Sequence, residues 1–533
     1  MLYRSWPQTV FFFVYTPISL SLRVESLAEF AKTGDVDPDL RFYFNITGTS
    51  AQEQEAFRRA LLEQAQVDPV LLSRLFNTDI GEAILETFGE IIQIQRDGNG
   101  KYALRGALIT AAFEPEGLSL LNFLQELPVN IQIDISQALA LSSAVSAVVD
   151  ATTLITADIA RLSLQEVQRN PPDFSQLPDL RLRGGYGVQE REVWNLYDQN
   201  RNRKLYALVY KPERYPPGKI PVVIFSHGLA SRPEDFAEQA RHLASYGYVV
   251  VLPNHPGSDI NQVRGLIEGF NRDIFVLNEF IDRPLDISFM IDVLESRNQE
   301  QFEGRLNLKS VGVAGHSFGG YGALAVAGAT LNFDYLEKEC SQQFRYLNVS
   351  LLLQCRALEL PRKEYNFRDE RVGAVFVANP VNSAIFGPEG LAKINLPVFL
   401  GAGTYDPATP VIFEQARSFP WFTVPNKYLL IIEGQAHVDF SQLDAGLTEI
   451  IDSVENLTLP SPYLINSYAN AMMTAFFQTY TANNPDYLIY LQPSYAVYLS
   501  QGEPFKSYLI TSESSDELAQ ILAQFRDRNP LFR

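Results

Sequence analysis

Ser317 lies in the run Val311–Gly320 (VGVAGHSFGG), where an apolar stretch ends in the motif Gly-x-Ser-x-Gly and an alanine-rich run follows. Gly315 and Gly319 lack a Cβ, so a strand and a helix can approach closely around the serine. A strand, a sharp turn and a helix in this order expose a serine hydroxyl at the edge of a sheet. A chance match to so short a motif is the alternative, but the flanking strand and helix patterns favour a nucleophilic serine.

His437 is the only histidine that follows Ser317 among the five in the chain. In one common order of serine hydrolases the acid and then the general base follow the nucleophile along the chain. His437 comes after the apolar run Tyr428–Ile432 and a loop that contains Gly434, where a base would reach the edge of a sheet. The alternative is an ordinary exposed histidine. We predict that His437 accepts the proton of Ser317.

Asp406 lies in the turn after another apolar run, Leu396–Leu400, and is the predicted acid. A buried carboxylate there would accept the Nδ1–H of His437 and stabilise the imidazolium form. Asp-Pro is common in turns, so capping of the turn is the alternative role for Asp406. Asp439 is too close to His437 along the chain to orient it, and Asp369 lies in a charged loop, so both are predicted to be solvated.

An oxyanion hole needs two backbone N–H groups that point at the developing negative charge. We predict Phe318, at the start of the helix after the nucleophile, as one donor. We predict Leu229 as the other, because it follows a buried strand and the sequence Ser-His-Gly.

The histidines before Ser317 are assigned supporting roles. His227 is expected to hold the loop of Leu229 by hydrogen bonding and His255 to orient a second loop. His242 is expected to lie at the surface or to pack within a helix.

The pattern of residues 188–533 predicts an α/β fold. A hairpin over Val188–Tyr197 and Lys204–Lys211 opens it, and buried strands then alternate with helices, which is typical of a mostly parallel sheet flanked by helices. Residues 331–370 are an insertion beside the site, where we expect a lid or a pocket wall. After residue 440 we expect a helix and tyrosine-rich strands such as Asp486–Gln492.

Residues 1–169 are predicted to form a mainly helical N-terminal domain, and residues 170–187 a linker rich in proline and glycine. Ile18–Val24 alternates between apolar and other residues, which indicates a short N-terminal strand pair. The helices are expected at Val24–Thr33, Ala51–Gln66, Ile80–Ile92 and Ile135–Gln168.

The run Ile135–Gln168 is the longest of these predicted helices. Its apolar residues are expected to pack on neighbouring helices, with lipid binding as the alternative; they include Leu139, Leu141, Val145, Val148 and Leu154. No run is expected to span a membrane. The uncharged residues 5–22 do not form a convincing signal peptide, so a cytoplasmic and an exported location both remain open.

Composition and charge describe a well-packed globular protein. The 533 residues are 46% hydrophobic and 20% charged, with a net charge of −19, which argues against nucleic acid as a partner.

Cys340 and Cys355 are the only cysteines. They are expected to form a disulfide if the protein is exported and to be buried thiols if it is cytosolic. No Cys/His cluster has metal-ligand spacing, so no metal site is expected.

Four segments together resemble a known family. They are Phe225–Ala230, Tyr248–Gly257, Gly315–Gly320 and Gly434–Phe440. Residues 185 to 450 look like the plasma-type platelet-activating-factor acetylhydrolases and related bacterial esterases of the α/β-hydrolase fold. The part before resembles a helical domain of uncharacterised role that precedes such hydrolases in cyanobacterial proteins. The resemblance implies cofactor-free hydrolysis of lipid or other short-acyl esters.

One position departs from that family. In the plasma enzymes the acid follows the strand directly after the nucleophile helix, where this chain has Asn379. Asp406 lies one strand later, as in dienelactone hydrolases and polyester-cleaving esterases. The resemblance therefore implies a carboxylic ester hydrolase more firmly than a phospholipase. An amidase or acyltransferase with the same triad, or a hydrolase fold kept as a non-catalytic binding protein, are the alternatives.

Overall fold

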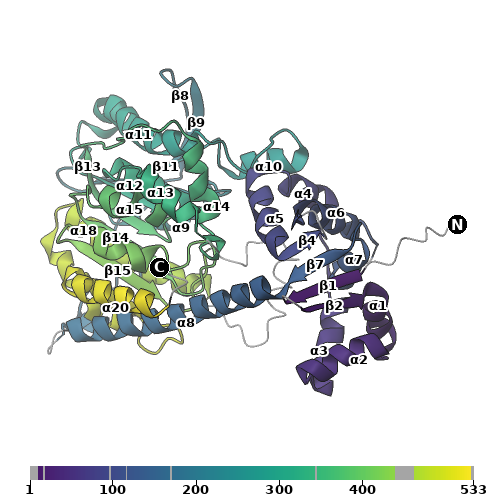
Figure 1. Ribbon diagram of the computed structural model, residues 1–533. Helices are drawn as coiled ribbons and strands as arrows, with labels where there is room; N and C mark the ends of the chain where they lie inside the picture. The colour runs from purple at the N-terminus through teal and green to yellow at the C-terminus, as the bar shows by residue number, and fades with distance from the viewer. Residues whose placement is uncertain are drawn as a thin grey trace. The chain divides into compact units, whose positions relative to one another are not determined.

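The computed structural model describes residues 10–15, 18–94, 98–115, 117–167, 171–342, 345–437 and 461–529 (Figure 1). Two compact units divide the chain. The first comprises the residues up to Val145 together with Arg264–Ile274, and the second begins at Ser146 and holds the rest of the described residues. The division falls inside a long helix, earlier than residue 169, where the sequence analysis placed the end of the first domain.

The first unit combines helices with a small mixed sheet. Its strand order is β2-β1-β7-β4-β5, in which β1 pairs antiparallel with β2 and parallel with β7. The strands of this sheet are β1 (Val10–Tyr15), β2 (Ile18–Arg23), β4 (Ile92–Ile94), β5 (Gly98–Asn99) and β7 (Ile131–Asp134), and a separate pair is β3 (Gln64–Ala65) with β6 (Leu118–Ser119). The helices are α1 (Val24–Thr33), α2 (Pro38–Thr47), α3 (Ala51–Leu62), α4 (Pro69–Leu75), α5 (Asp79–Ile91), α6 (Lys101–Ala112) and α7 (Leu120–Gln125).

Local sequence signals explain where these helices begin and end. Helix α1 ends at Gly34, which has a φ of 81° and so closes the helix in the left-handed conformation. Ser50 and Glu53 form a capping box at the start of α3, because each side chain accepts a hydrogen bond from the backbone N–H of the other residue. The predicted N-terminal strand pair is the hairpin β1–β2, but three further strands extend it into a sheet.

Helix α8 (Ile135–Glu166) is the longest described helix, and its length and composition would allow it to cross a membrane. The sequence analysis expected no run long and apolar enough to do so, which α8 contradicts by its length and composition. The hydroxyl residues of α8 can bond within the helix: Thr152 Oγ1 donates to the carbonyl of Val148 at 2.9 Å. Contrary to the packing predicted for them, some apolar side chains of α8 are exposed: Leu139, Val145 and Leu154.

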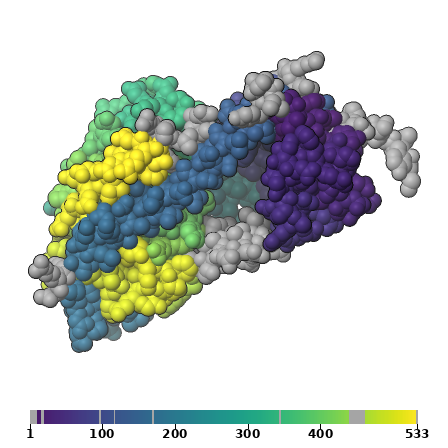
Figure 2. Space-filling model, turned by 60° about the horizontal axis from the view of Figure 1, so that its bottom comes forward, coloured from purple at the N-terminus to yellow at the C-terminus, as the bar shows by residue number. Residues whose placement is uncertain are grey.

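The second half of α8 is joined to C-terminal elements of the second unit. The carboxylate of Glu166 accepts hydrogen bonds from the N–H and hydroxyl of Thr511 and from Ser514, and Arg161 pairs with Glu517. In Figure 2 this part of α8 lies beside the yellow C-terminal segments.

A nine-stranded sheet organises the second unit, in the order β16-β15-β14-β13-β12-β10-β11-β9-β8. The six strands from β15 to β11 are parallel, and β16, β9 and β8 add antiparallel edges. The bounds are β8 (Glu192–Asp198), β9 (Arg203–Tyr210), β10 (Val222–Ser226), β11 (Val249–Pro253), β12 (Val311–His316), β13 (Val372–Ala378), β14 (Val398–Gly403), β15 (Lys427–Ile432) and β16 (Ser507–Thr511). Every residue of β10, β11, β14 and β15 is buried, which suits a sheet covered on both faces.

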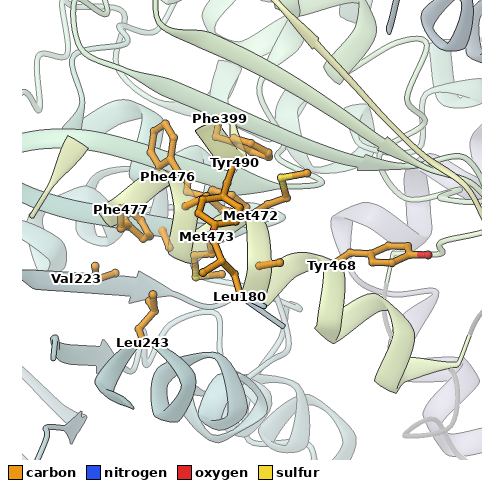
Figure 3. Close-up of a cluster of buried hydrophobic side chains, with 14 of the residues drawn as sticks. Leu180, Val223, Leu243, Phe399, Tyr468, Met472, Met473, Phe476, Phe477 and Tyr490 are labelled. Atoms are coloured by element: carbon orange, nitrogen blue, oxygen red, sulfur yellow. The ribbon is translucent and has the colours of Figure 1, made fainter. Parts of the chain in front are cut away.

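Helices cover the two faces. On one face α9 (Ala237–Ser245) and α18 (Pro462–Tyr480) pack on Val223, Phe376 and Phe399, and Figure 3 shows the aromatic and methionine side chains of α18 in this core. On the other face lie α11 (Glu279–Phe302) and α12 (Phe318–Val326). A Cβ on Gly320 of α12 would lie 3.6 Å from Cβ of Val377, whose side chain points opposite to that of Phe376.

The insertion at 331–370 is helical and tied to the rest of the unit. A disulfide joins Cys340 at the end of α13 (Phe333–Cys340) to Cys355, which follows α14 (Leu351–Gln354). The buried carboxylate of Glu414 accepts hydrogen bonds from three insertion side chains and from the backbone N–H groups that open α15 (Ser383–Leu391); the insertion donors are Asn348, Ser350 and Gln354.

The remaining described helices complete the second unit. The prediction of a strand at Asp486–Gln492 is wrong. Pro485–Tyr490 is a 3-10 helix, and its Tyr490 is buried against α18. The alternation of apolar and polar residues therefore reflects the packing of a short helix. The other elements are α10 (Ile260–Glu268), which runs across the division, α16 (Gln415–Ser418), α19 (Pro493–Leu499) and α20 (Ser515–Arg528).

Candidate active site

Ser317 occupies a strained turn between β12 and α12. Its φ of 55° and ψ of −121° lie in a region that side chains rarely adopt. Close packing of the neighbouring glycines enforces the turn. A Cβ on Gly315 would lie 2.3 Å from the carbonyl oxygen of Gly319, and a Cβ on Gly319 would lie 2.0 Å from that of Ser226. The chain can therefore make this turn only with glycine at both positions.

The structure brings Ser317, His437 and Asp406 together. The Ser317 hydroxyl lies 2.8 Å from Nε2 of His437, and Nδ1 of His437 lies 2.7 Å from Oδ2 of Asp406. An ionised carboxylate only accepts hydrogen bonds, so Nδ1 carries the proton and Nε2 accepts from the serine. This is the hydrogen-bond chain that a serine nucleophile and its general base require.

Asp406 is buried in a turn that supplies several donors. The N–H groups of Ala408 and Thr409 each lie 2.9 Å from Oδ1, and the Thr409 hydroxyl lies 2.8 Å from Oδ2. Burial alone would raise the pKa of the carboxyl, but His437 and these donors outweigh it and lower the pKa below its usual value. Asp406 is thus held as a carboxylate beside the imidazole.

The two other aspartates behave differently. The prediction that Asp369 is solvated is wrong, because its side chain is only 10% exposed and pairs with Arg371 at 2.6 Å. Asp439 lies outside the described residues. Asn379 follows β13 with a φ of 45°, and its Oδ1 accepts the N–H of Gly403 at 3.1 Å. The side-chain amide of Asn379 is therefore bonded to the backbone of the neighbouring strand β14.

The loop after β10 lies against the nucleophile turn. A Cβ on Gly228 would be 3.3 Å from Cβ of Ser317. Within the described chain neither the backbone nor a side chain accepts a hydrogen bond from the N–H of Leu229, and Phe318 is the first residue of α12, where an N–H has no acceptor in its own helix. Both predicted oxyanion donors thus flank Ser317 with their N–H groups available.

Three of the four histidines before Ser317 are buried, namely His227, His242 and His255. Nδ1–H of His227 donates to the carbonyl of Gly228 at 2.8 Å, and Nε2 accepts the N–H of His255 at 3.1 Å. His242 lies in α9 with its ring 5.3 Å from that of Tyr246. Desolvation lowers the pKa of all three imidazoles, so they are neutral at pH 7.

Two features of the site were not predicted from the sequence. His316 donates Nε2–H to the carbonyl of His437 at 2.9 Å. Beneath the loop of Leu229 lies an ionic cluster in which Glu279, Arg283 and Asp286 are buried. Side chains of β9, its preceding turn and α11 form it: Arg201, Arg203, Glu279, Asp282, Arg283 and Asp286. The spacing of Glu279, Arg283 and Asp286 places them on one face of a helix, and that spacing was the available signal.

A groove of about 900 Å³ lies between the second half of α8 and the loops that lead to Asp406 and His437. Threonine and apolar side chains of α8 line one wall, and Tyr405, Phe505 and Tyr508 line the other. Ser317 is not among the lining residues. In the described part of the chain, no group of three or more His, Cys, Asp or Glu side chains is placed to hold a metal ion.

Two family models match the chain. Residues 8–134 match one described as "Alpha/beta hydrolase of unknown function (DUF1400)", and residues 182–338 match one described as "Chlorophyllase". The second match spans the loop of Leu229 and the turn of Ser317, and it ends before Asp406. The chain carries an α/β-hydrolase domain. No curated protein matches the sequence.

Proposed function

We propose that this protein is a serine carboxylic ester hydrolase that works through an acyl-enzyme. The observation that carries the proposal is the continuous hydrogen-bond chain from Ser317 through His437 to Asp406 at the edge of the sheet. The α/β-hydrolase matches support the same reaction class.

In the first half-reaction His437 takes the proton of Ser317 as the hydroxyl oxygen attacks the ester carbonyl carbon. The carbonyl oxygen becomes an oxyanion, which accepts hydrogen bonds from the N–H groups of Leu229 and Phe318. Asp406 stabilises the imidazolium, which then protonates the alcohol as it leaves. In the second half-reaction His437 removes a proton from water as the water oxygen attacks the acyl-serine carbonyl. The imidazolium then returns the proton to the oxygen of Ser317 as the acyl–serine bond breaks, and the acid is released.

The contacts of residues 331–370 favour a fixed pocket wall over a mobile lid. The insertion's disulfide joins two of its own helical segments, and the insertion's bonds to Glu414 hold it to the N-terminus of α15. The loop before α15 touches the nucleophile turn, because the N–H of Val381 donates to the carbonyl of Ser317 at 3.2 Å. We propose that this wall limits the group bound beside Ser317, with lipid or other short-acyl esters as the substrate class.

The direct test is hydrolysis of p-nitrophenyl esters, from acetate to palmitate, by the wild-type protein and Ser317→Ala. The proposal predicts activity that Ser317→Ala abolishes. Retained hydrolysis by that variant would exclude Ser317 as the nucleophile. The panel includes chlorophyll, an ester of a long-chain alcohol, because of the name of the matched family. It also includes an anilide and an alcohol acceptor, so that amidase or acyltransferase activity would be recognised by its product.

A further inference from the structure

Arg283 of α11 is fully buried beneath the loop that carries Leu229. Its Nη1 donates to the carbonyl of His227 at 2.6 Å, and its Nη2 donates to the carbonyl of Gly228 at 3.1 Å. Nε donates to the hydroxyl of Ser258 at 2.9 Å. Ser258 supports the same loop, because its carbonyl accepts the N–H of Ala230. Every nitrogen of the guanidinium therefore bonds either the loop or the segment that supports it.

The bond to Gly228 sets the direction of the next N–H group. The peptide between Gly228 and Leu229 is planar, so its C=O and N–H point in opposite directions. Two donors hold that carbonyl, Nη2 of Arg283 at 3.1 Å and Nδ1 of His227 at 2.8 Å. The N–H of Leu229 must therefore point away from both of them.

Arg283 also contacts the second arm of the proposed oxyanion hole. Its guanidinium lies 4.5 Å from the centre of the Phe318 ring, within the range of a cation–π contact. One side chain thus contacts Phe318 and the carbonyl of Gly228, whose peptide bond carries the N–H of Leu229. A lysine has no planar fork, so it would retain the charge without bonding two carbonyls at once.

The surrounding cluster keeps the guanidinium in place. Glu279 lies 3.7 Å from Nε of Arg283, and Arg203 bonds both Glu279 and Asp286. Asp286 also accepts Nδ1–H of His255, whose backbone N–H bonds His227. Because each charge is paired, the burial of Arg283 is compensated and its orientation is fixed from several sides.

We propose that Arg283, together with His227, is a positioning residue that fixes the Gly228–Leu229 peptide so that the N–H of Leu229 faces the oxyanion. This inference rests on the proposed hydrolysis at Ser317. It assigns a role in transition-state stabilisation to a residue that does not touch substrate.

The test compares Arg283→Lys with Arg201→Lys. Arg201 belongs to the same cluster and bonds Asp286 at 2.7 Å, and no hydrogen bond between described residues joins it to the loop of Leu229, so it is a matched control. For Arg283→Lys we expect kcat to fall about 10- to 100-fold with little change in KM, because an interaction specific to the transition state is weakened. The Ki of a trifluoromethyl ketone, which forms an oxyanion on the serine, should rise by the same factor. Arg201→Lys keeps a positive charge beside Asp286 and leaves both bonds from Arg283 to the loop in place, so we expect a lower Tm but changes in kcat and Ki several-fold smaller than those of Arg283→Lys.

His227→Phe provides a second variant if Arg283→Lys does not fold. It removes the other donor to the Gly228 carbonyl and should also lower kcat with KM nearly constant. Equal losses in kcat for Arg283→Lys and Arg201→Lys, or wild-type Ki values in both Arg283→Lys and His227→Phe, would overturn the proposal.

A crystal structure of Arg283→Lys separates this proposal from the proposed function. If the wild-type protein has no Ser317-dependent hydrolysis, the proposed function fails, and the structure still decides what Arg283 does. A rotated or disordered Gly228–Leu229 peptide would support the positioning role. An unchanged peptide would refute it whatever the activity.

Discussion

His316 holds the backbone of His437 through a hydrogen bond of 2.9 Å from Nε2–H to the carbonyl oxygen. The residue directly before the proposed nucleophile is thus bonded to the proposed base. His316 is partly buried, and desolvation lowers the pKa of its imidazole from 6.5 to about 3, so it stays a neutral donor over the range in which an esterase would work.

Because His316 is neutral in the folded protein, we predict that the free energy of unfolding falls in mild acid. Below pH 6.5 the unfolded chain protonates the residue, whereas folded His316 stays neutral to about pH 3. The unfolded state then binds more protons, so stability falls as the pH falls through this window. His316→Gln keeps a donor near the Nε2 position and removes the titration. The measurement is the free energy of unfolding in urea at pH 7 and at pH 5. From pH 7 to pH 5 the His316→Gln variant should lose about 2 kcal/mol less than the wild type. An identical loss in the two proteins would contradict this account.

Asp406→Asn should fold normally and lose turnover. An asparagine can donate to Nδ1, which favours the wrong tautomer of His437, so we expect kcat to fall about 10,000-fold. The measurement is steady-state hydrolysis with circular dichroism as the check on folding. Asp369→Asn, in the salt bridge with Arg371, is the control and should keep its kcat. Full activity in Asp406→Asn would remove Asp406 from the triad.

Two glycines of α12 should respond in opposite ways to alanine. A Cβ on Gly319 would overlap the backbone oxygen of Ser226 at 2.0 Å, so Gly319→Ala should destabilise the protein by about 3 kcal/mol or more and displace the nucleophile turn. A Cβ on Gly322 would meet its nearest neighbour at 3.5 Å, and alanine favours a helix by about 1 kcal/mol. Thermal unfolding should therefore show a lower Tm for Gly319→Ala and an unchanged or higher Tm for Gly322→Ala. The reverse order would be inconsistent with this turn.

Glu414→Gln should loosen the insertion. The amide nitrogen of glutamine would face donors that now bond a carboxylate, including the N–H groups of Asn382 and Ser383, each at 2.9 Å. We expect a loss of about 2 to 4 kcal/mol and faster proteolysis within residues 331–370. Glu389→Gln, at an exposed bond to Asn332, is the matched control and should behave like the wild type. Equal proteolysis of the two variants would show that Glu414 does not anchor the insertion.

The α/β character of the second unit could be predicted because buried apolar runs alternate with helical patterns over most of its length. The elbow at Ser317 was predictable for a local reason: the glycines that permit the turn are adjacent to the serine in sequence. The loops of Asp406 and His437 were located because each follows a fully buried strand, whose end fixes where its loop emerges.

Other features depend on contacts between distant segments. The role of Arg283 arises where α11 passes under the loop after β10, and no local pattern specifies that contact. Tyr490 was assigned to a strand because its neighbours alternate, but packing against α18 selects a short helix. The exposed apolar side chains of α8 were misjudged for the same reason, since composition does not specify which neighbours a helix finds.

Covalent labelling tests the central claim most directly. A fluorophosphonate reacts with a serine whose proton is removed by a neighbouring base and whose product is stabilised by oxyanion donors. Peptide mass spectrometry of the labelled wild-type protein should find the phosphonyl group on Ser317 alone, with no label in Ser317→Ala and slow labelling in His437→Ala. A correctly folded wild-type protein that remains unlabelled, or that is labelled at another serine, would contradict the account.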